Sequence, residues 1–262
     1  MEWSNPVWPG RKMMLRSARP KAVTARTGLV FAHHGVGRNG WDSREYWLDL
    51  VDQHDLMVIA PEFPPEGFPG VAWYNFGHLR GEDGSMLPVE ASTYSIDKRL
   101  FADLRAQGLT AQAEYGIFGH SAGSQFVHRM ISLGFREAVR LAVVANAGTY
   151  AFADTAIAWP YGLGGTGVGD LAPLFGFPML VMAGTADIDT SSPNFPKEPQ
   201  AMAQGGTRFE RAQRYHAGAQ AAAAALGVAC AWRFEAVEGV AHDGCRMTAA
   251  AAPHLAAALH QA

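Results

Sequence analysis

The sequence predicts an α/β protein in which helices cover both faces of a mostly parallel β-sheet. Short apolar segments alternate with segments of helical periodicity about six times along the chain, which is the pattern of repeated strand–helix units. The apolar segments are nearly continuous, as expected for strands that are buried on both faces. No Pro- or Ser-rich linker and no internal repeat breaks the pattern, so we expect residues 1–262 to form a single domain.

The first half of the chain contains three predicted strands and three predicted helices. The strands are 28–35, 56–64 and 115–118, and the helices are 41–56, 94–108 and 124–133. Asp42 or Ser43 is the expected N-cap of the first helix, and Gly108 is the expected stop of the second, because glycine readily ends a helix. The segment 64–92 between them is a predicted loop.

The second half continues the alternation with strands 141–148, 178–184 and 231–237. An alanine-rich helix is expected over 207–227, because alanine has the highest helix propensity, and a closing helix follows from Met247. The segment 149–176 is rich in glycine and aromatic residues and has little periodicity, so it is a second predicted loop.

Composition excludes several classes of protein. A hydrophobic content of 48% against 17% charged residues supports a sizeable core and argues against disorder. The net charge is only −3 and no run of lysines and arginines occurs, so we expect neither a nucleic-acid nor a membrane partner. No segment has the length of a membrane span or of a signal-peptide core, so we expect a cytoplasmic protein, or a secreted one without its leader.

The segment Gly119-His120-Ser121-Ala122-Gly123 places a serine where a predicted strand turns directly into a helix. Such a turn strains the backbone of its central residue, and small residues two positions away on either side relieve the crowding. The spacing predicts a nucleophilic serine at Ser121, whereas a purely structural glycine turn is the alternative.

A serine hydroxyl needs a base, and His242 follows the last predicted strand at the same edge of the sheet. Asp187 follows the preceding strand and would hold the imidazole in the required tautomer, with Asp189 as its rival. Aspartates are common in surface loops, so the prediction of a triad depends mainly on the order of Ser121, Asp187 and His242 along the chain. One known class of catalytic triad has this order.

Acyl transfer also requires donors for the oxyanion that forms in the transition state. We expect one donor to be the backbone N–H of Ala122 and the other to be that of Val36, in the glycine-containing loop after the first predicted strand. His33 and His34 in that loop could ligate a metal. No carboxylate or cysteine cluster accompanies them at ligand spacing, so we expect no metal and no cofactor.

With these residues in order, the chain resembles the α/β-hydrolase superfamily from Gly28 to its end. The matching segments are "HHGVGRNG", "GHSAGS", "WPYGLGG" and "GTADID", and they are most similar to poly(3-hydroxybutyrate) depolymerase-like esterases and their feruloyl-esterase relatives. The resemblance implies a hydrolase of polyester-type or aryl esters that needs no cofactor. It also implies the triad Ser121, Asp187 and His242, with Val36 and Ala122 forming the oxyanion hole.

Four side chains are predicted to bind the substrate. Trp73 lies in the loop 64–92, Trp159 and Tyr161 lie in the loop 149–176, and His120 precedes the serine. We expect both loops to line the substrate pocket. The alternative is that the aromatic residues only pack each loop against the sheet.

The sequence leaves the substrate and the assembly open. The chain shows no signal peptide, appended binding domain or cysteine framework of a secreted depolymerase, so a small ester, an oligomer or an acyl thioester remains an alternative substrate. A peptidase or amidase could use the same triad. A cysteine nucleophile and an inactive binding module are disfavoured. Cys230 and Cys245 permit one disulfide, although free buried thiols are expected. The oligomeric state is not determined.

Overall fold

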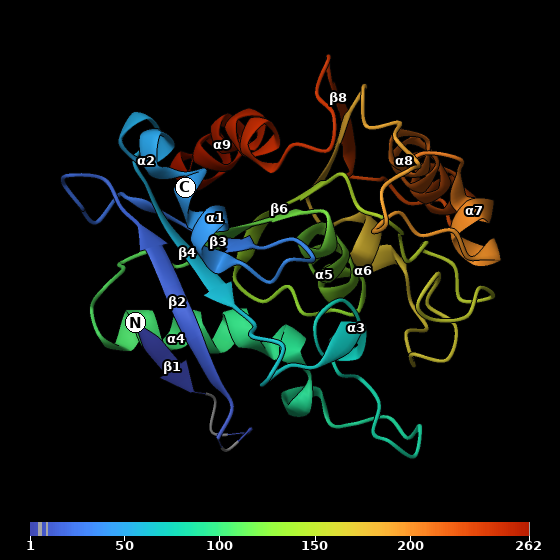
Figure 1. Cartoon of the computed structure of the whole chain (residues 1–262), viewed down its shortest axis with the longest axis horizontal. Coiled ribbons are helices and arrows are strands. Elements are labelled where there is room, and N and C mark those ends of the chain that lie inside the picture. The colour runs from blue at the N-terminus through green and yellow to red at the C-terminus, as the bar shows by residue number, and fades with distance from the viewer. Residues whose placement is uncertain (5–6, 9, 262) are drawn as a thin grey trace.

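A sheet of eight strands runs through the middle of the described part of the protein (Figure 1). The computed structural model describes residues 1–4, 7–8 and 10–261. The strands lie in the order β1-β2-β4-β3-β5-β6-β7-β8. Their bounds are β1 Glu2–Ser4, β2 Lys12–Ala18, β3 Gly28–His33, β4 Leu56–Glu62, β5 Tyr115–His120, β6 Val139–Ala145, β7 Met179–Gly184 and β8 Arg233–Val237. All pairs from β4 to β8 are parallel, and β1 and β2 are antiparallel additions at one edge.

Helices pack on both faces of this sheet (Figure 1). Their bounds are α1 Gly40–Glu45, α2 Leu48–His54, α3 Gly70–Trp73, α4 Ile96–Ala106, α5 Ala122–Ser132, α6 Ala172–Phe175, α7 Pro199–Gln204, α8 Arg208–Ala225 and α9 Gly244–His260, with short 3₁₀ turns at Val89–Ala91 and Thr93–Ser95. Helices α4, α5 and α8 share one hydrophobic cluster with the sheet, whereas α2 and α9 share the other. The predicted α/β class, with a mostly parallel sheet covered on both faces in one domain, is confirmed.

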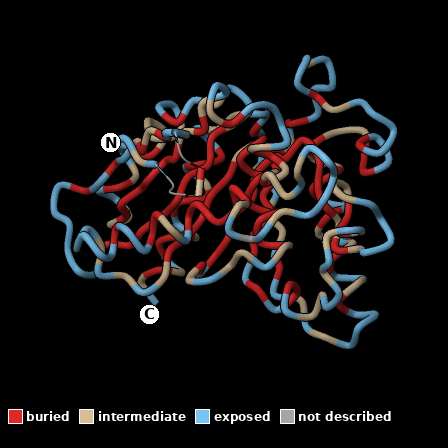
Figure 2. The backbone as a smooth tube through the Cα atoms, turned by 90° about the horizontal axis from the view of Figure 1, so that it is seen from below, coloured by how far each residue is buried: buried red, intermediate tan, exposed pale blue. Residues whose placement is uncertain are grey.

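The two clusters arise from the alternation of side chains along each strand. In β3, Leu29 and Phe31 belong to the cluster under α4 and α5, and Val30 and Ala32 belong to the cluster under α9. Every residue of β3 is buried, which explains why its sequence is apolar without interruption. Figure 2 shows the buried segments gathered in the middle of the molecule and the exposed ones in the peripheral loops.

Two features at the start of the chain differ from the sequence prediction. Strands β1 and β2 were not expected; in β2 the residues Met13 and Leu15 alternate with more exposed ones, as suits an antiparallel strand near the edge. The helix predicted over 41–56 is two helices, because the chain turns at Trp47, whose ring is buried against Phe118.

The predicted caps were partly wrong. The N-cap of α1 is Asn39, whose side chain accepts a hydrogen bond from the Asp42 N–H, so Asp42 lies in the first turn and Ser43 in the helix. Gly108 does follow the end of α4, with a φ of +70° that favours glycine. Short helices α3 and α6 occur in the two segments predicted as loops, and α7 occurs where no element was predicted.

Candidate active site

Ser121 lies at the turn between β5 and α5 and adopts a backbone conformation that is rare outside glycine. Its φ and ψ are 58° and −116°, and its N–H donates to the Ala145 carbonyl oxygen at 3.0 Å. The flanking glycines allow this turn: a Cβ on Gly119 would lie 2.3 Å from Gly123, and one on Gly123 would lie 2.1 Å from the carbonyl oxygen of His33. The predicted need for small residues at these two positions is therefore met.

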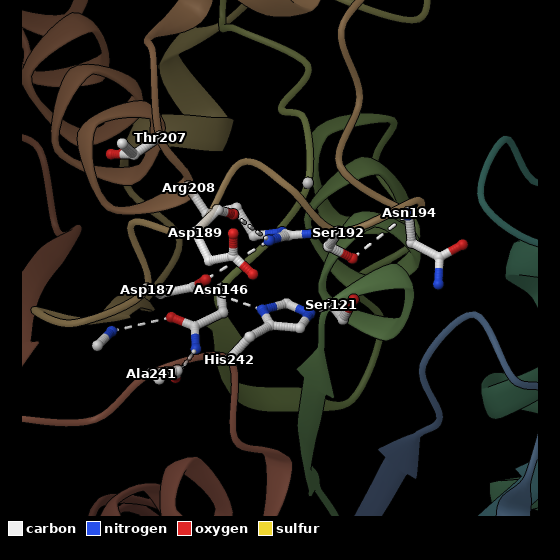
Figure 3. Close-up of polar contacts among 12 residues, drawn as sticks. Ser121, Asn146, Asp187, Asp189, Ser192, Asn194, Thr207, Arg208, Ala241 and His242 are labelled. Carbon is white, nitrogen blue, oxygen red and sulfur yellow. Dashed lines mark hydrogen bonds and ion pairs between the residues drawn. The ribbon is translucent and has the colours of Figure 1, made fainter.

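The structure brings Ser121, His242 and Asp187 together from three loops (Figure 3). His242 Nε2 lies 2.9 Å from Ser121 Oγ, and His242 Nδ1 lies 2.8 Å from Asp187 Oδ2. A carboxylate only accepts, so we assign the ring proton to Nδ1, which leaves Nε2 able to accept the serine proton. The arrangement can transfer a proton away from the hydroxyl while an electrophile approaches Oγ.

The predicted rival, Asp189, does not contact His242. Its carboxylate accepts a hydrogen bond from the Ser191 N–H at 2.7 Å, and the residue is exposed. The Asp187 side chain is only 1% exposed and lies behind the imidazole, which is itself 32% exposed. Of the two aspartates, Asp187 therefore occupies the position that can orient His242.

A close approach of two loops holds the acid and the base near each other. Strand β7 ends at Gly184, where a Cβ would lie 2.1 Å from the Val240 carbonyl oxygen of the loop that carries His242. Asn146, which follows β6 with a φ of +52°, joins the same loops: its Oδ1 accepts from the Gly184 N–H at 2.9 Å, and its Nδ2 donates to the Ala241 carbonyl oxygen at 3.2 Å. Asn146 is fully buried and thus acts as a fixed bridge.

The predicted oxyanion donors lie on either side of Ser121. Ala122 is the first residue of α5, so its N–H has no acceptor within the helix. Val36 lies in the turn after β3, where the Arg38 N–H closes back onto the Gly35 carbonyl oxygen, and Val36 lines the same cavity as Ser121. Neither amide donates to another group in the described part of the chain. Their role as donors to an oxyanion stays a prediction.

The two histidines before this turn have structural partners. His34 Nε2 accepts from the Phe63 N–H at 3.1 Å, so its Nδ1 carries the proton and donates to the Gly35 carbonyl oxygen at 3.0 Å. Complete burial lowers the pKa of His34 to about 3, so the ring is neutral. His33 Nε2 lies 2.8 Å from a carboxylate oxygen of Asp97 on α4. No group of three metal-ligating side chains occurs among the described residues.

A cavity of about 260 Å³ opens beside Ser121. His242, Val36 and His120 lie in its wall, so the structure places His120 next to the predicted nucleophile. Burial, together with the nearby His242 and Arg208, lowers the pKa of His120 to about 3. His120 is therefore neutral, and it offers the cavity one donor or one acceptor rather than a charge.

The predicted aromatic residues do not line this cavity. Trp159 and Tyr161 line a second, mostly apolar cavity of about 460 Å³. Trp73 stacks on His78 with ring centroids 3.4 Å apart and lies under the guanidinium of Arg11. No described residue of the loops 64–92 and 149–176 lines the cavity beside Ser121. The expectation that both loops line the pocket is therefore not met there. The role of Trp159 and Tyr161 in substrate binding stays a prediction.

Sequence reasoning missed two side chains of the site. Asn146 directly follows β6 at the edge where the other candidates lie, so its position could have been noticed from the strand prediction. Arg208, at the start of α8, lies 3.5 Å from Asp187 Oδ1 (Figure 3). No sequence pattern indicates this contact, which depends on how α8 packs.

Cys230 and Cys245 are free, as expected, but the prediction that they are buried was wrong. Cys230 is partly exposed in the loop before β8, and Cys245 is exposed in the first turn of α9. Neither follows a strand as Ser121 does. No helix in the described residues is long and apolar enough to cross a membrane.

The comparisons with known proteins define the class. No protein-family model and no curated protein matches the chain. The structure of LpqC, a poly(3-hydroxybutyrate) depolymerase from Bordetella parapertussis, is 38% identical with a TM-score of 0.89, covering 92% of this chain and 84% of that chain. The chain therefore belongs to the α/β-hydrolase superfamily, whose members similar to it include esterases and depolymerases.

A second similar structure is poly(aspartic acid) hydrolase-1 from Sphingomonas sp. KT-1. It is 31% identical with a TM-score of 0.92, and the match covers 97% of each chain. An S-formylglutathione hydrolase from Agrobacterium tumefaciens is 16% identical with a TM-score of 0.58, covers 99% of this chain and 93% of its own, and shares the fold. Within the superfamily, this chain is thus similar to depolymerase-like hydrolases over nearly its full length.

Proposed function

We propose that this protein is a serine hydrolase of carboxylic esters. Ser121 is the nucleophile, His242 is the general base and Asp187 orients the imidazole. The observation that carries the proposal is the single ring of His242, which lies within hydrogen-bond distance of both Ser121 Oγ and Asp187 Oδ2. The backbone strain at Ser121 supports the same role, because strained residues cluster at functional sites.

In the first half of the reaction, Ser121 Oγ attacks the ester carbonyl carbon while its proton moves to His242 Nε2. The carbonyl oxygen becomes an oxyanion, which the N–H groups of Val36 and Ala122 stabilise. The intermediate collapses, the bond to the alcohol oxygen breaks, and the imidazolium returns its proton to the departing alcohol. The acyl group remains on Ser121 as an ester.

In the second half, water takes the place of the alcohol. His242 accepts a proton from the water as its oxygen attacks the acyl-enzyme, and the same two amides stabilise the second oxyanion. The carboxylic acid leaves, and the proton returns to Ser121 Oγ. Apart from the ester and one water molecule, both halves use only groups of this chain.

The proposed substrates are esters of short acyl units, including oligomers of 3-hydroxyalkanoates. The similarity to a poly(3-hydroxybutyrate) depolymerase supports this class. A second candidate is amide hydrolysis, because the poly(aspartic acid) hydrolase matches 97% of the chain and poly(aspartic acid) is a polyamide. The same acylation chemistry serves both bonds, provided that His242 protonates the leaving amine.

Active-site titration with a fluorophosphonate probe tests the nucleophile. We expect one equivalent of probe to react with the wild-type protein and none with Ser121→Ala. Removal of the nucleophile should lower ester hydrolysis by roughly four to six powers of ten. Labelling that survives Ser121→Ala, or no labelling of the wild-type protein, would refute the proposal.

A paired panel separates the two bond classes. We expect p-nitrophenyl esters and 3-hydroxybutyrate oligomers to be cleaved faster than the p-nitroanilides of the same acyl groups and faster than poly(aspartic acid). Cleavage of amides with no cleavage of matched esters would replace the ester proposal with the amide one.

The cavity lined by Trp159 and Tyr161 is a candidate subsite for the far part of an oligomeric substrate, since its wall is aromatic and mostly apolar. Trp159→Ala should then raise KM for a hydroxybutyrate trimer severalfold and leave KM for p-nitrophenyl acetate unchanged. Equal changes for both substrates would argue for a structural role of the ring.

A further inference from the structure

Arg208 lies beside Asp187, near the carboxylate oxygen that does not contact His242 (Figure 3). Its side chain is 3% exposed, and its Nη1 atom is 3.5 Å from Asp187 Oδ1. The other carboxylate oxygen, Oδ2, accepts from His242. Each oxygen of Asp187 therefore lies near one group: Oδ1 is near the Arg208 cation and Oδ2 accepts from His242.

The position of Arg208 is unfavourable for the helix that carries it. Arg208 is the first residue of α8, where the helix dipole repels a cation. The helix start does not need it, since Thr207 Oγ1 already accepts from the Glu210 N–H at 3.1 Å and Glu210 Oε2 accepts from the Gly206 N–H at 2.6 Å. A buried cation at this end of a capped helix requires compensation from elsewhere, and Asp187 supplies it.

Other contacts fix the guanidinium and the acid together. The guanidinium of Arg208 lies over the ring of Phe195 at 5.1 Å, and its Nη1 donates to the Asp189 carbonyl oxygen at 3.5 Å. The Phe209 N–H, also in the first turn of α8, donates to the carbonyl oxygen of Asp187 at 3.4 Å. The first turn of α8 thus contacts Asp187 twice, through a hydrogen bond to its backbone and an ion pair with its side chain.

We propose that Arg208 is a positioning residue of the hydrolase: it fixes Asp187 so that Oδ2 faces His242, and its charge opposes protonation of the Asp187–His242 pair. The inference rests on the proposed function. Among the described residues, the other polar side chains next to His242 are His120, which is titratable and whose ring centroid lies 4.7 Å away, and Ser121. Next to it in sequence, Asp243 caps α9. Arg208 is the cation that faces Asp187 in the described structure.

The proposal predicts a specific change in pH dependence. Without the cation, the Asp187–His242 pair binds a proton more readily, so the base is blocked at a higher pH. In Arg208→Met, we expect the acid limb of kcat/KM for an activated ester to move up by about one pH unit. Arg208→Lys keeps the charge, so its acid limb should stay close to that of the wild type while kcat falls severalfold.

Arg211 offers a matched control on the same helix. It is also buried and lies over the same Phe195 ring at 4.3 Å, but its guanidinium donates to the carbonyl oxygens of Gly205, Gly148 and Pro196 rather than to Asp187. Arg211→Met should lower thermal stability without moving the acid limb. Arg208→Gln is a second uncharged variant, and it keeps a polar side-chain end. It serves as the test if Arg208→Met does not fold.

The experiment measures kcat/KM and fluorophosphonate labelling rates from pH 4.5 to 9, with thermal unfolding of each variant. Movement of the acid limb in Arg208→Met or Arg208→Gln, but not in Arg208→Lys or Arg211→Met, supports the proposal. An unmoved limb in the uncharged variants overturns it, even if activity falls, and so does an equal shift in Arg211→Met. A wild-type protein that is neither labelled nor active overturns the proposed function itself, which is a different result.

Discussion

The half of the site that carries Ser121 is held within one short stretch of chain, whereas the half that carries Asp187 and His242 is assembled from distant segments. Ser121 lies directly between β5 and α5, with Gly119 in the strand and Gly123 in the helix. Asp187 and His242 lie 55 residues apart in sequence, and their loops are joined through Asn146 and the first turn of α8. We therefore expect the two halves to fail in different ways when they are mutated.

After the loss of the nucleophile itself, the largest effect on catalysis is expected at the acid. Asp187→Asn removes the acceptor that fixes the His242 tautomer, so kcat should fall by roughly 10³–10⁴, with little change in KM. Asp189→Asn is the matched control, because that carboxylate is exposed and accepts its hydrogen bonds from Ser191. It should change kcat less than threefold. Steady-state kinetics on one activated ester checks both, and a larger loss in Asp189→Asn would reverse the assignment.

In the half of the site that carries Ser121, we expect the largest loss of stability from a steric clash. In Gly123→Ala, the added Cβ would meet the carbonyl oxygen of His33 at 2.1 Å, so we expect a loss of more than about 4 kcal/mol in the free energy of unfolding, or no folded protein. Gly37→Ala, in the neighbouring loop, meets nothing within 4 Å and should cost less than about 1 kcal/mol. Urea denaturation compares the two. Similar midpoints would mean that the backbone relaxes around the elbow.

In the half of the site that carries Asp187 and His242, we expect activity to depend on the hydrogen bonds that join the loops. Asn146→Ala removes the links to Gly184 and Ala241, so kcat should fall roughly ten- to a hundredfold as the loops of Asp187 and His242 loosen. Asn146→Gly loses the same hydrogen bonds, but glycine adopts the φ of +52° at this position without strain. Comparison of the two variants therefore separates the effect of backbone strain from that of the hydrogen bonds. Both variants should lose activity. Retention of activity in Asn146→Gly alone would assign the effect to backbone strain.

The smallest effect concerns stability at low pH. The pKa of buried His34 is lowered to about 3, below its value of 6.5 in the unfolded chain. Between these values the unfolded chain binds the extra proton, so stability falls as the pH falls, by about 1.4 kcal/mol per pH unit well below pH 6.5. His34→Gln should be less stable at pH 7 but lose less on acidification. Urea titrations at pH 7 and pH 4.5 check this, and an unchanged slope would contradict it.

The fold was largely predictable because buried parallel strands have an unmistakable sequence pattern. Each of the six strands from β3 to β8 was expected within a few residues of its observed bounds. Strands β1 and β2 were not, since two short antiparallel strands near a sheet edge bury only part of their side chains. The helix from 41 to 56 was expected as one element because its apolar spacing does not reveal that Trp47 turns into the core.

The site divides along the same line. The strand-to-helix turn at Ser121 was predictable from the sequence, because the spacing of Gly119, Ser121 and Gly123 is local, while the contact that requires Gly123 comes from the His33 carbonyl oxygen. The sequence also places Asp187 and His242 after two strands whose carboxyl ends lie at the same edge of the sheet. Three features required the three-dimensional structure: the choice of Asp187 over Asp189, the absence of the predicted aromatic rings from the wall of the cavity beside Ser121, and the contact of Arg208 with Asp187. These contacts join side chains that are distant in sequence and come together only when the helices and loops pack. No local sequence pattern predicts them.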